Sequence, residues 1–253
     1  SSLLSLHANI SDAVKIFIPA VLVFFVGMAI TPIVTHYLYK WKFWKKASVS
    51  KTMDGREATI TKAIHDDEVR QTPRMGGVIV WGSVVLTTII MALLARVLPS
   101  ETSIKLSYLS RNQTLLPFFT LIVASLIGLI DDLFVVGGKG TYAGGGLSLR
   151  KRLVLVSILA LLGACWFYFK LDTTGIHIPF DGEWNLGLFF IPFFAFTMIS
   201  MYSGGIIDGI DGLAGGVFIM MFSAYGVIAY AQNQVDLATF CMVIAGSLDR
   251  KSV

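Results

Sequence analysis

Residues 125–133 read S-L-I-G-L-I-D-D-L and place two adjacent carboxylates, Asp131 and Asp132, at the end of a long apolar run. Carboxylates beside hydrocarbon repel each other and lose hydration, so a divalent cation or a cationic cluster is needed to neutralise them. The alternative is that both residues close a helix at the membrane surface and face water. A second acidic stretch, Asp208-Gly-Ile-Asp211-Gly, also ends an apolar run and favours the first interpretation.

The composition indicates a protein that crosses a membrane several times. Of the 253 residues, 55% are hydrophobic and 14% are charged, and the mean hydropathy is +0.73. Several uncharged runs exceed the roughly 18 residues that suggest a membrane span. Cys165 and Cys241 both lie inside apolar runs, where we expect buried thiols rather than a disulfide or a nucleophile. The net charge of +4 is modest, and no nucleic-acid-binding module is indicated.

The apolar runs predict an all-α, polytopic membrane bundle that forms a single domain over residues 1–253. Six runs are long enough to cross a bilayer, and a last run at 237–248 is too short to cross about 30 Å at 1.5 Å per residue. We therefore predict six full transmembrane helices and an incomplete seventh, which is either cut short or needs a partner. Alternation near Ile176–Phe180 predicts a small external β-hairpin at about 172–182. The first four expected spans are 16–39, 75–95, 112–130 and 153–169, and the last two lie within 184–207 and 212–235.

Basic residues set the expected orientation of the spans. Nine Lys or Arg residues lie between Lys40 and Arg74, and Arg150-Lys151-Arg152 forms a second basic block. By the positive-inside rule both segments are cytoplasmic and the N-terminus is external. The expected cytoplasmic loops are then 40–74, 131–152 and 204–212, so both acidic stretches lie at the inner membrane boundary.

This arrangement suits a phosphorylated substrate. A metal ion held by Asp side chains would bridge phosphate oxygens and stabilise developing charge, while Lys and Arg hold the remaining charge. Simpler roles exist for the separate parts: Gly204 and Gly205 would permit close helix packing, and the Arg150–Arg152 block would be a topogenic anchor.

Four ordered motifs resemble those of a known enzyme family. Over residues 16–248 the chain is similar to the polyprenyl-phosphate N-acetylhexosamine-1-phosphate transferases, and within them most similar to the phospho-N-acetylmuramoyl-pentapeptide translocases. The motifs are Thr72-Pro-Arg-Met-Gly-Gly77, Gly128-Leu-Ile-Asp-Asp132, Gly146-Leu-Ser-Leu-Arg150 and Asp208-Gly-Ile-Asp-Gly-Leu-Ala214.

The resemblance implies a Mg²⁺-dependent enzyme of peptidoglycan biosynthesis in the bacterial inner (plasma) membrane. Such an enzyme transfers phospho-MurNAc-pentapeptide from UDP-MurNAc-pentapeptide to undecaprenyl phosphate, giving lipid I and UMP. Its active site would lie on the cytoplasmic face of the lipid bilayer, and a homodimer is compatible with it.

The same resemblance assigns roles to residues that match the motifs. The expected catalytic residues are Asp131, Asp132, Asp208 and Asp211, of which the first three are expected to bind the metal. The residues expected to bind substrate or phosphate are Arg70, Thr72, Arg150, Arg152 and Gly205.

The chain also departs from the family pattern. Gly205 replaces the usual Asn, and Arg74 and Arg152 stand where Thr and Lys are usual. The family's Gly-Asp-x-Gly-Ser metal motif and its His-rich cytoplasmic loop do not occur in the sequence. We therefore expect a chain that is C-terminally truncated relative to the family and inactive as it stands.

Two alternatives remain open at this point. A sister transferase that uses UDP-N-acetylglucosamine shares the acidic motifs, and assays with both UDP-sugars would separate the two. A transporter or ion channel would instead use membrane carboxylates to relay cations, and such carboxylates are expected near mid-membrane rather than at one face.

Overall fold

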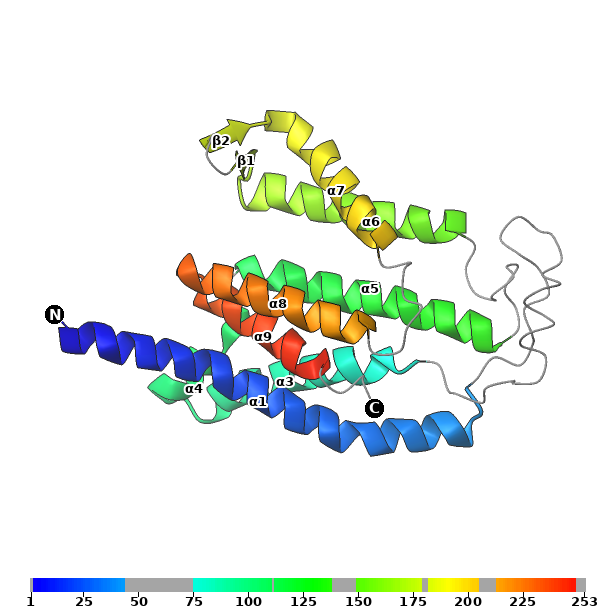
Figure 1. The fold of residues 1–253 in the computed structure, drawn as a ribbon, viewed down its shortest axis with the longest axis horizontal. Coiled ribbons are helices and arrows are strands. Elements are labelled where there is room, and N and C mark those ends of the chain that lie inside the picture. The colour runs from blue at the N-terminus through cyan, green and yellow to red at the C-terminus, as the bar shows by residue number, and fades with distance from the viewer. Residues whose placement is uncertain are drawn as a thin grey trace. The chain divides into compact units, whose positions relative to one another are not determined.

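The computed structural model describes residues 2–43, 75–110, 112–137, 149–178, 182–204 and 213–248. Over these residues the chain is helical apart from one two-stranded sheet (Figure 1). The long helices are α1 (Ser2–Lys40), α3 (Gly77–Val97), α5 (Asn112–Val136), α6 (Leu149–Lys170) and α8 (Leu213–Ala231). The shorter elements are α4 (Glu101–Leu106), η1 (Tyr108–Ser110), η2 (Gly187–Phe189), α7 (Phe190–Gly204) and α9 (Val235–Leu248).

The helices confirm the predicted class of a helical membrane protein. Among the described residues, five helices are long and apolar enough to cross a membrane, and α7 and α9 are shorter apolar helices. The short α9 was expected. Helix α7 (Phe190–Gly204) lies within 184–207, where a full span was expected, but with 15 residues it is not among these five helices. A glycine with a positive φ of 53°, Gly187, redirects the chain just before α7, and Pro192 fits the first helical turn because its missing N–H would have no partner there.

The predicted hairpin is confirmed and extends slightly further than expected. Strand β1 (Gly175–Ile178) pairs antiparallel with β2 (Gly182–Asn185), with Ile176 opposite Trp184. The hairpin therefore joins α6 to α7 through η2.

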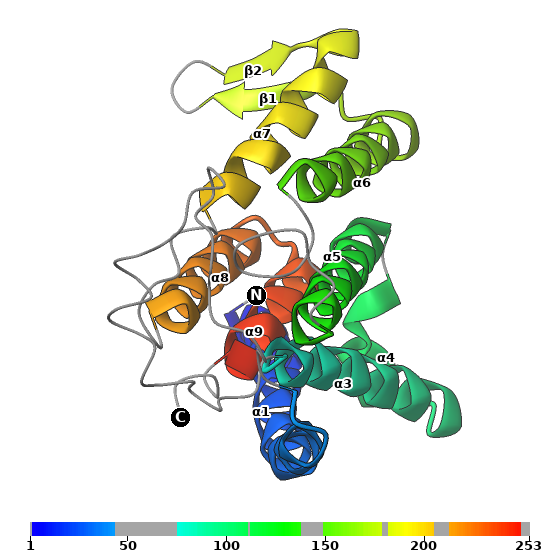
Figure 2. The ribbon, with the colours of Figure 1, turned by 90° about the vertical axis from the view of Figure 1, so that its right-hand side faces the viewer.

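The chain divides into two compact units. The first contains α1, α3, α4, η1, the start of α5 up to Phe119, α8 and α9. The second contains α5 from Thr120 onward, α6, the hairpin and α7. In the second unit α7 lies beside α6 (Figure 2), with the Phe167 and Phe194 ring centroids 5.1 Å apart.

Helix α9 lies at the centre of the first unit. It packs against α1 and α8 and also contacts α3 and η1 (Figures 1 and 2). A Cβ added at Gly246 would lie 2.8 Å from the Ala20 carbonyl oxygen, so glycine permits a close approach of α9 to α1. The surface of this short helix is therefore covered by protein. Its buried residues are Asp236, Ala238, Thr239, Phe240, Cys241, Val243, Ile244, Ala245, Ser247 and Leu248.

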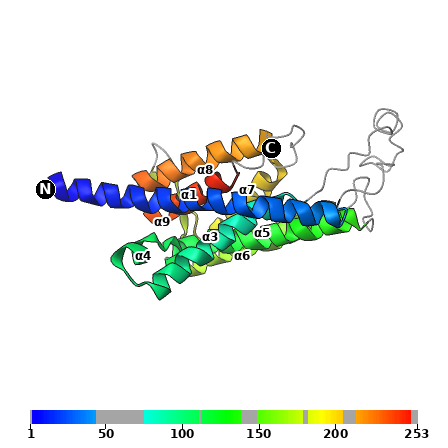
Figure 3. The ribbon, with the colours of Figure 1, turned by 90° about the horizontal axis from the view of Figure 1, so that it is seen from below.

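The helix directions in the first unit agree with the predicted alternation of spans. Helices α1 and α9 run the same way, while α8 runs opposite to both (Figures 1 and 3). Accordingly, Ile16 near the start of α1 shares a buried cluster with Ala229 near the end of α8 and Ala238 near the start of α9. Which end faces the cytoplasm stays a prediction.

That prediction is testable at the two ends of α6. In a cysteine-free background, Glu183→Cys in exposed β2 should react with a membrane-impermeant maleimide added to intact cells. Lys151→Cys, exposed in the first turn of α6, should react only after the cells are permeabilised. The reverse labelling pattern would overturn the predicted orientation.

Candidate active site

The two adjacent carboxylates lie inside a helix rather than closing one. Helix α5 continues past Asp131 and Asp132 to Val136, and the Gly137 N–H still donates to the Leu133 carbonyl at 2.9 Å. The residues that follow the acidic pair are apolar helix formers, and the first glycine comes only at 137. Both Asp residues are half-buried on this helix, so they are not simply residues of a helix end turned to water.

The second basic block starts a helix rather than ending a loop. Helix α6 begins at Leu149, so Arg150, Lys151 and Arg152 occupy its first turn. The partial positive charge at a helix N-terminus disfavours cations there, so the basic block is placed where an opposite charge from another helix is favourable.

Asp131 and Arg152 supply that charge to each other. The Arg152 Nε donates to Asp131 Oδ1 at 3.3 Å, and Nη2 donates to Oδ2 to complete a two-point ion pair. The Asp131 side chain is 16% exposed and that of Arg152 is 36% exposed, so the pair is partly shielded from solvent. Two predicted site residues, 21 positions apart in the sequence, thus meet in the second unit.

The other predicted site residues fall into two groups. Arg150 is exposed on α6 and Asp132 is half-buried on α5, next to the ion pair in sequence. Five of the predicted residues lie outside the described residues, so the expected meeting of the two acidic stretches stays a prediction: Arg70, Thr72, Gly205, Asp208 and Asp211. Among the described residues, no group of three or more His, Cys, Asp or Glu side chains could hold a metal ion.

The geometry allows an exchange of partners. A guanidinium group matches a carboxylate and a phosphate through the same planar pair of N–H donors, so Arg152 can bind either one. A phosphate that reached Arg152 would replace the Asp131 carboxylate, which would then be able to bind a cation. The sequence predicts both residues for the site but does not pair them, although a basic block at the N-terminus of a helix favours an acidic partner from another helix.

Comparison with known proteins gives a consistent result. Residues 114–248 match the family described as glycosyl transferase family 4, a range that contains both acidic stretches and the second basic block. Three relatives carry the name phospho-N-acetylmuramoyl-pentapeptide-transferase. That of Clostridium perfringens (strain 13 / Type A) is 28% identical over 236 residues, covering 92% of this chain and 65% of the relative.

The other two relatives have slightly higher sequence identities to this chain. The Clostridium kluyveri protein is 30% identical over 240 residues, covering 92% of this chain and 66% of the relative. The Geobacillus sp. (strain WCH70) protein is 31% identical over 183 residues, covering 70% of this chain and 51% of the relative. The chain thus spans about 65% of the length of the first curated relatives it matches.

The ion pair should contribute measurably to stability. Replacing Arg152 with Met leaves the Asp131 carboxylate without its two-point partner, and we expect the free energy of unfolding in detergent to fall by about 1–2 kcal/mol, between typical exposed and buried pairs. Thermal unfolding followed by helical circular dichroism measures this. Arg150→Met, in the same turn but exposed, is the control and should change stability little; equal effects of the two variants would contradict the pairing.

Proposed function

Because the chain belongs to glycosyl transferase family 4, we propose that it takes part in peptidoglycan synthesis as a phosphosugar transferase. In the finer form of the proposal, phospho-MurNAc-pentapeptide passes from UDP-MurNAc-pentapeptide to undecaprenyl phosphate, giving lipid I and UMP. The names of the relatives support this substrate, and the apolar helices support a multi-pass protein of the bacterial plasma membrane.

The observation that carries the proposal is the Asp131–Arg152 ion pair. It joins an acidic stretch to a basic one at the ends of two apolar helices, inside the range that matches the family. A site for phosphoryl transfer needs groups that bind phosphate and groups that neutralise charge, and most of the rate comes from placing them correctly. This pair holds a phosphate-binding group, the Arg152 guanidinium, next to an acidic group, the Asp131 carboxylate.

In the proposed mechanism, the lipid phosphate binds the Arg152 guanidinium and takes the place of the Asp131 carboxylate. An oxygen of the lipid phosphate attacks the sugar-linked phosphorus of the UDP-sugar. The bond between that phosphorus and the bridging oxygen breaks, and UMP leaves with the bridging oxygen. Arg150 and Arg152 would hold the non-reacting phosphate oxygens.

Magnesium is the cofactor that we propose for this reaction. Carboxylate oxygens are ligands that Mg²⁺ prefers, so Asp131 and Asp132 fit the ion, with Asp208 as the proposed third ligand. When bound, the ion would stabilise the charge that develops on the phosphate oxygens. Asp211 would act beside these residues at the nucleotide, and the site would face the cytoplasm.

The proposal predicts the effect of removing single carboxylates from the complete reading frame that contains these residues. Asn at position 131, 132, 208 or 211 should lower Mg²⁺-dependent UMP release from UDP-MurNAc-pentapeptide, in the presence of undecaprenyl phosphate, by on the order of a hundredfold or more. Glu183→Gln, on the exposed strand β2, is the control and should be fully active.

Two outcomes would contradict the proposal. Near-normal turnover of all four variants would show that these carboxylates are not the site. Turnover of UDP-N-acetylglucosamine in place of the MurNAc substrate would instead identify the sister transferase and leave the site assignment standing.

A further inference from the structure

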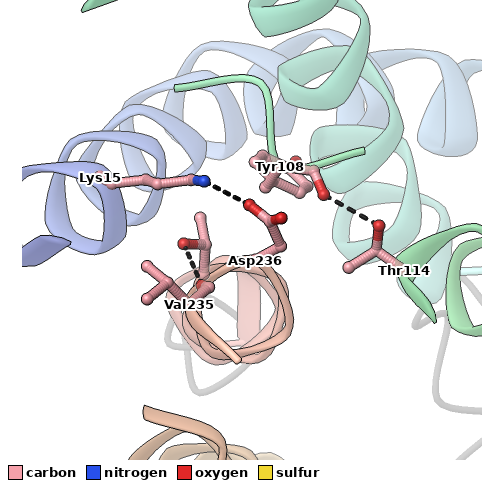
Figure 4. Close-up of polar contacts among 6 residues, drawn as sticks. Lys15, Tyr108, Thr114, Val235 and Asp236 are labelled. Carbon is pink, nitrogen blue, oxygen red and sulfur yellow. Dashed lines mark hydrogen bonds and ion pairs between the residues drawn. The ribbon is translucent and has the colours of Figure 1, made fainter. Parts of the chain in front are cut away.

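A second ion pair lies within the first unit and involves none of the predicted site residues. Lys15 of α1 meets Asp236 in the first turn of α9 (Figure 4). The side chain of Asp236 is 8% exposed and that of Lys15 is 19% exposed, so both charges are largely removed from solvent. Each lies at the edge of an apolar run, and nothing in the sequence paired them.

The ion pair lies beside a buried hydroxyl cluster. Tyr108 of η1 is 1% exposed, and its hydroxyl lies 2.6 Å from Thr88 Oγ1 of α3. Its carbonyl accepts a hydrogen bond from Thr114 Oγ1 at 2.9 Å (Figure 4), and its ring centroid lies 6.4 Å from that of Phe240 on α9. Burial raises the pKa of Tyr108 to about 12, while the Thr88 hydrogen bond acts in the opposite direction, so the phenol is neutral at physiological pH.

The negative charge of Asp236 makes the burial of α9 depend on a contact with another helix. With 14 residues it is too short to cross a bilayer alone, and a lone carboxylate in its first turn would oppose its transfer into an apolar environment. The helix N-terminus favours the negative charge of Asp236, but that effect is much weaker than the loss of hydration on burial. A cation from a neighbouring helix can compensate this charge, and the structure places Lys15 of α1 there.

We propose that the Lys15–Asp236 ion pair allows α9 to be buried against α1 at the centre of the first unit. The burial of α9 then depends on the positive charge of Lys15 matching the negative charge of Asp236. The two helices run in parallel from the ion pair to the close contact of Ala20 and Val23 with Gly246. The pair thus also sets the register at which Gly246 lies opposite the backbone of α1. This role is independent of the proposed transferase activity.

A native cysteine reports whether α9 is buried. Cys241 is 7% exposed on α9, and in a Cys165→Ala background it is the only thiol. In membranes, Cys241 of otherwise wild-type protein should react slowly with a membrane-permeant maleimide. Lys15→Met removes the cation that pairs with Asp236, and Asp236→Leu removes the anion that pairs with Lys15. We expect each variant to raise the labelling rate by on the order of tenfold or more.

Two further variants test whether charge matching, rather than the loss of either side chain, controls the labelling rate of Cys241. The double variant Lys15→Met/Asp236→Leu removes both charges, so it should restore slow labelling because nothing remains to be compensated. Lys40→Met, at the exposed end of the same helix α1, is the matched control and should label at the wild-type rate.

Each outcome decides the proposal. Slow labelling of both single variants would overturn it, and so would labelling of the double variant as fast as that of the single ones. If a single variant fails to accumulate in the membrane while the double variant does accumulate, the dependence on charge matching is supported. If the double variant also fails to accumulate, the proposal is wrong.

Discussion

Asp131 of α5 and Arg152 of α6 form an ion pair, and Arg152 lies in the first turn of its helix, where the backbone dipole disfavours a positive charge. An apolar bundle tolerates such groups only when another helix brings an opposite charge close enough to replace water. The same constraint applies to Lys15 and Asp236 in the first unit. Lys15 and Asp236 join two helices that pack closely, α1 and α9, whereas Asp131 and Arg152 join α5 and α6, which pack little against each other elsewhere in the described residues.

The apolar runs were sufficient to predict most of the secondary structure. Run length and charge placed α3, α6 and α8 within about four residues of their bounds, and alternation near Ile176 placed the hairpin. The expected span 16–39 begins well inside α1, which starts at Ser2, and the expected span 112–130 ends at the acidic pair although α5 continues to Val136. Helix α7 lies inside the expected 184–207 run but begins only at Phe190, because β2 and η2 occupy the residues before it. The central position of α9 could not be predicted, because it depends on contacts with α1 and α8 that are distant in sequence.

The candidate site was also predictable only in part, because it too depends on contacts between residues that are distant in sequence. Adjacent carboxylates after an apolar run marked Asp131 and Asp132, and the basic block marked Arg152, but composition carries no information about which cation meets which anion. The described geometry adds that Arg152 already occupies both carboxylate oxygens of Asp131. We therefore propose that Arg152 holds Asp131 until a phosphate binds, in addition to the expected role of Arg152 as a phosphate ligand.

Direct titration with Mn²⁺, a paramagnetic substitute for Mg²⁺, tests without relying on turnover whether Asp131 binds a cation and is held by Arg152. Electron paramagnetic resonance on the purified chain in lipid nanodiscs measures the free ion. We expect the Asp131→Asn variant to bind Mn²⁺ on the order of tenfold more weakly, because it lacks the carboxylate. We expect the Arg152→Met variant to bind Mn²⁺ on the order of tenfold more tightly, because Arg152 and the cation compete for the same carboxylate. Unchanged Mn²⁺ affinity in both variants would contradict the claim that Asp131 is the cation-binding carboxylate held by Arg152.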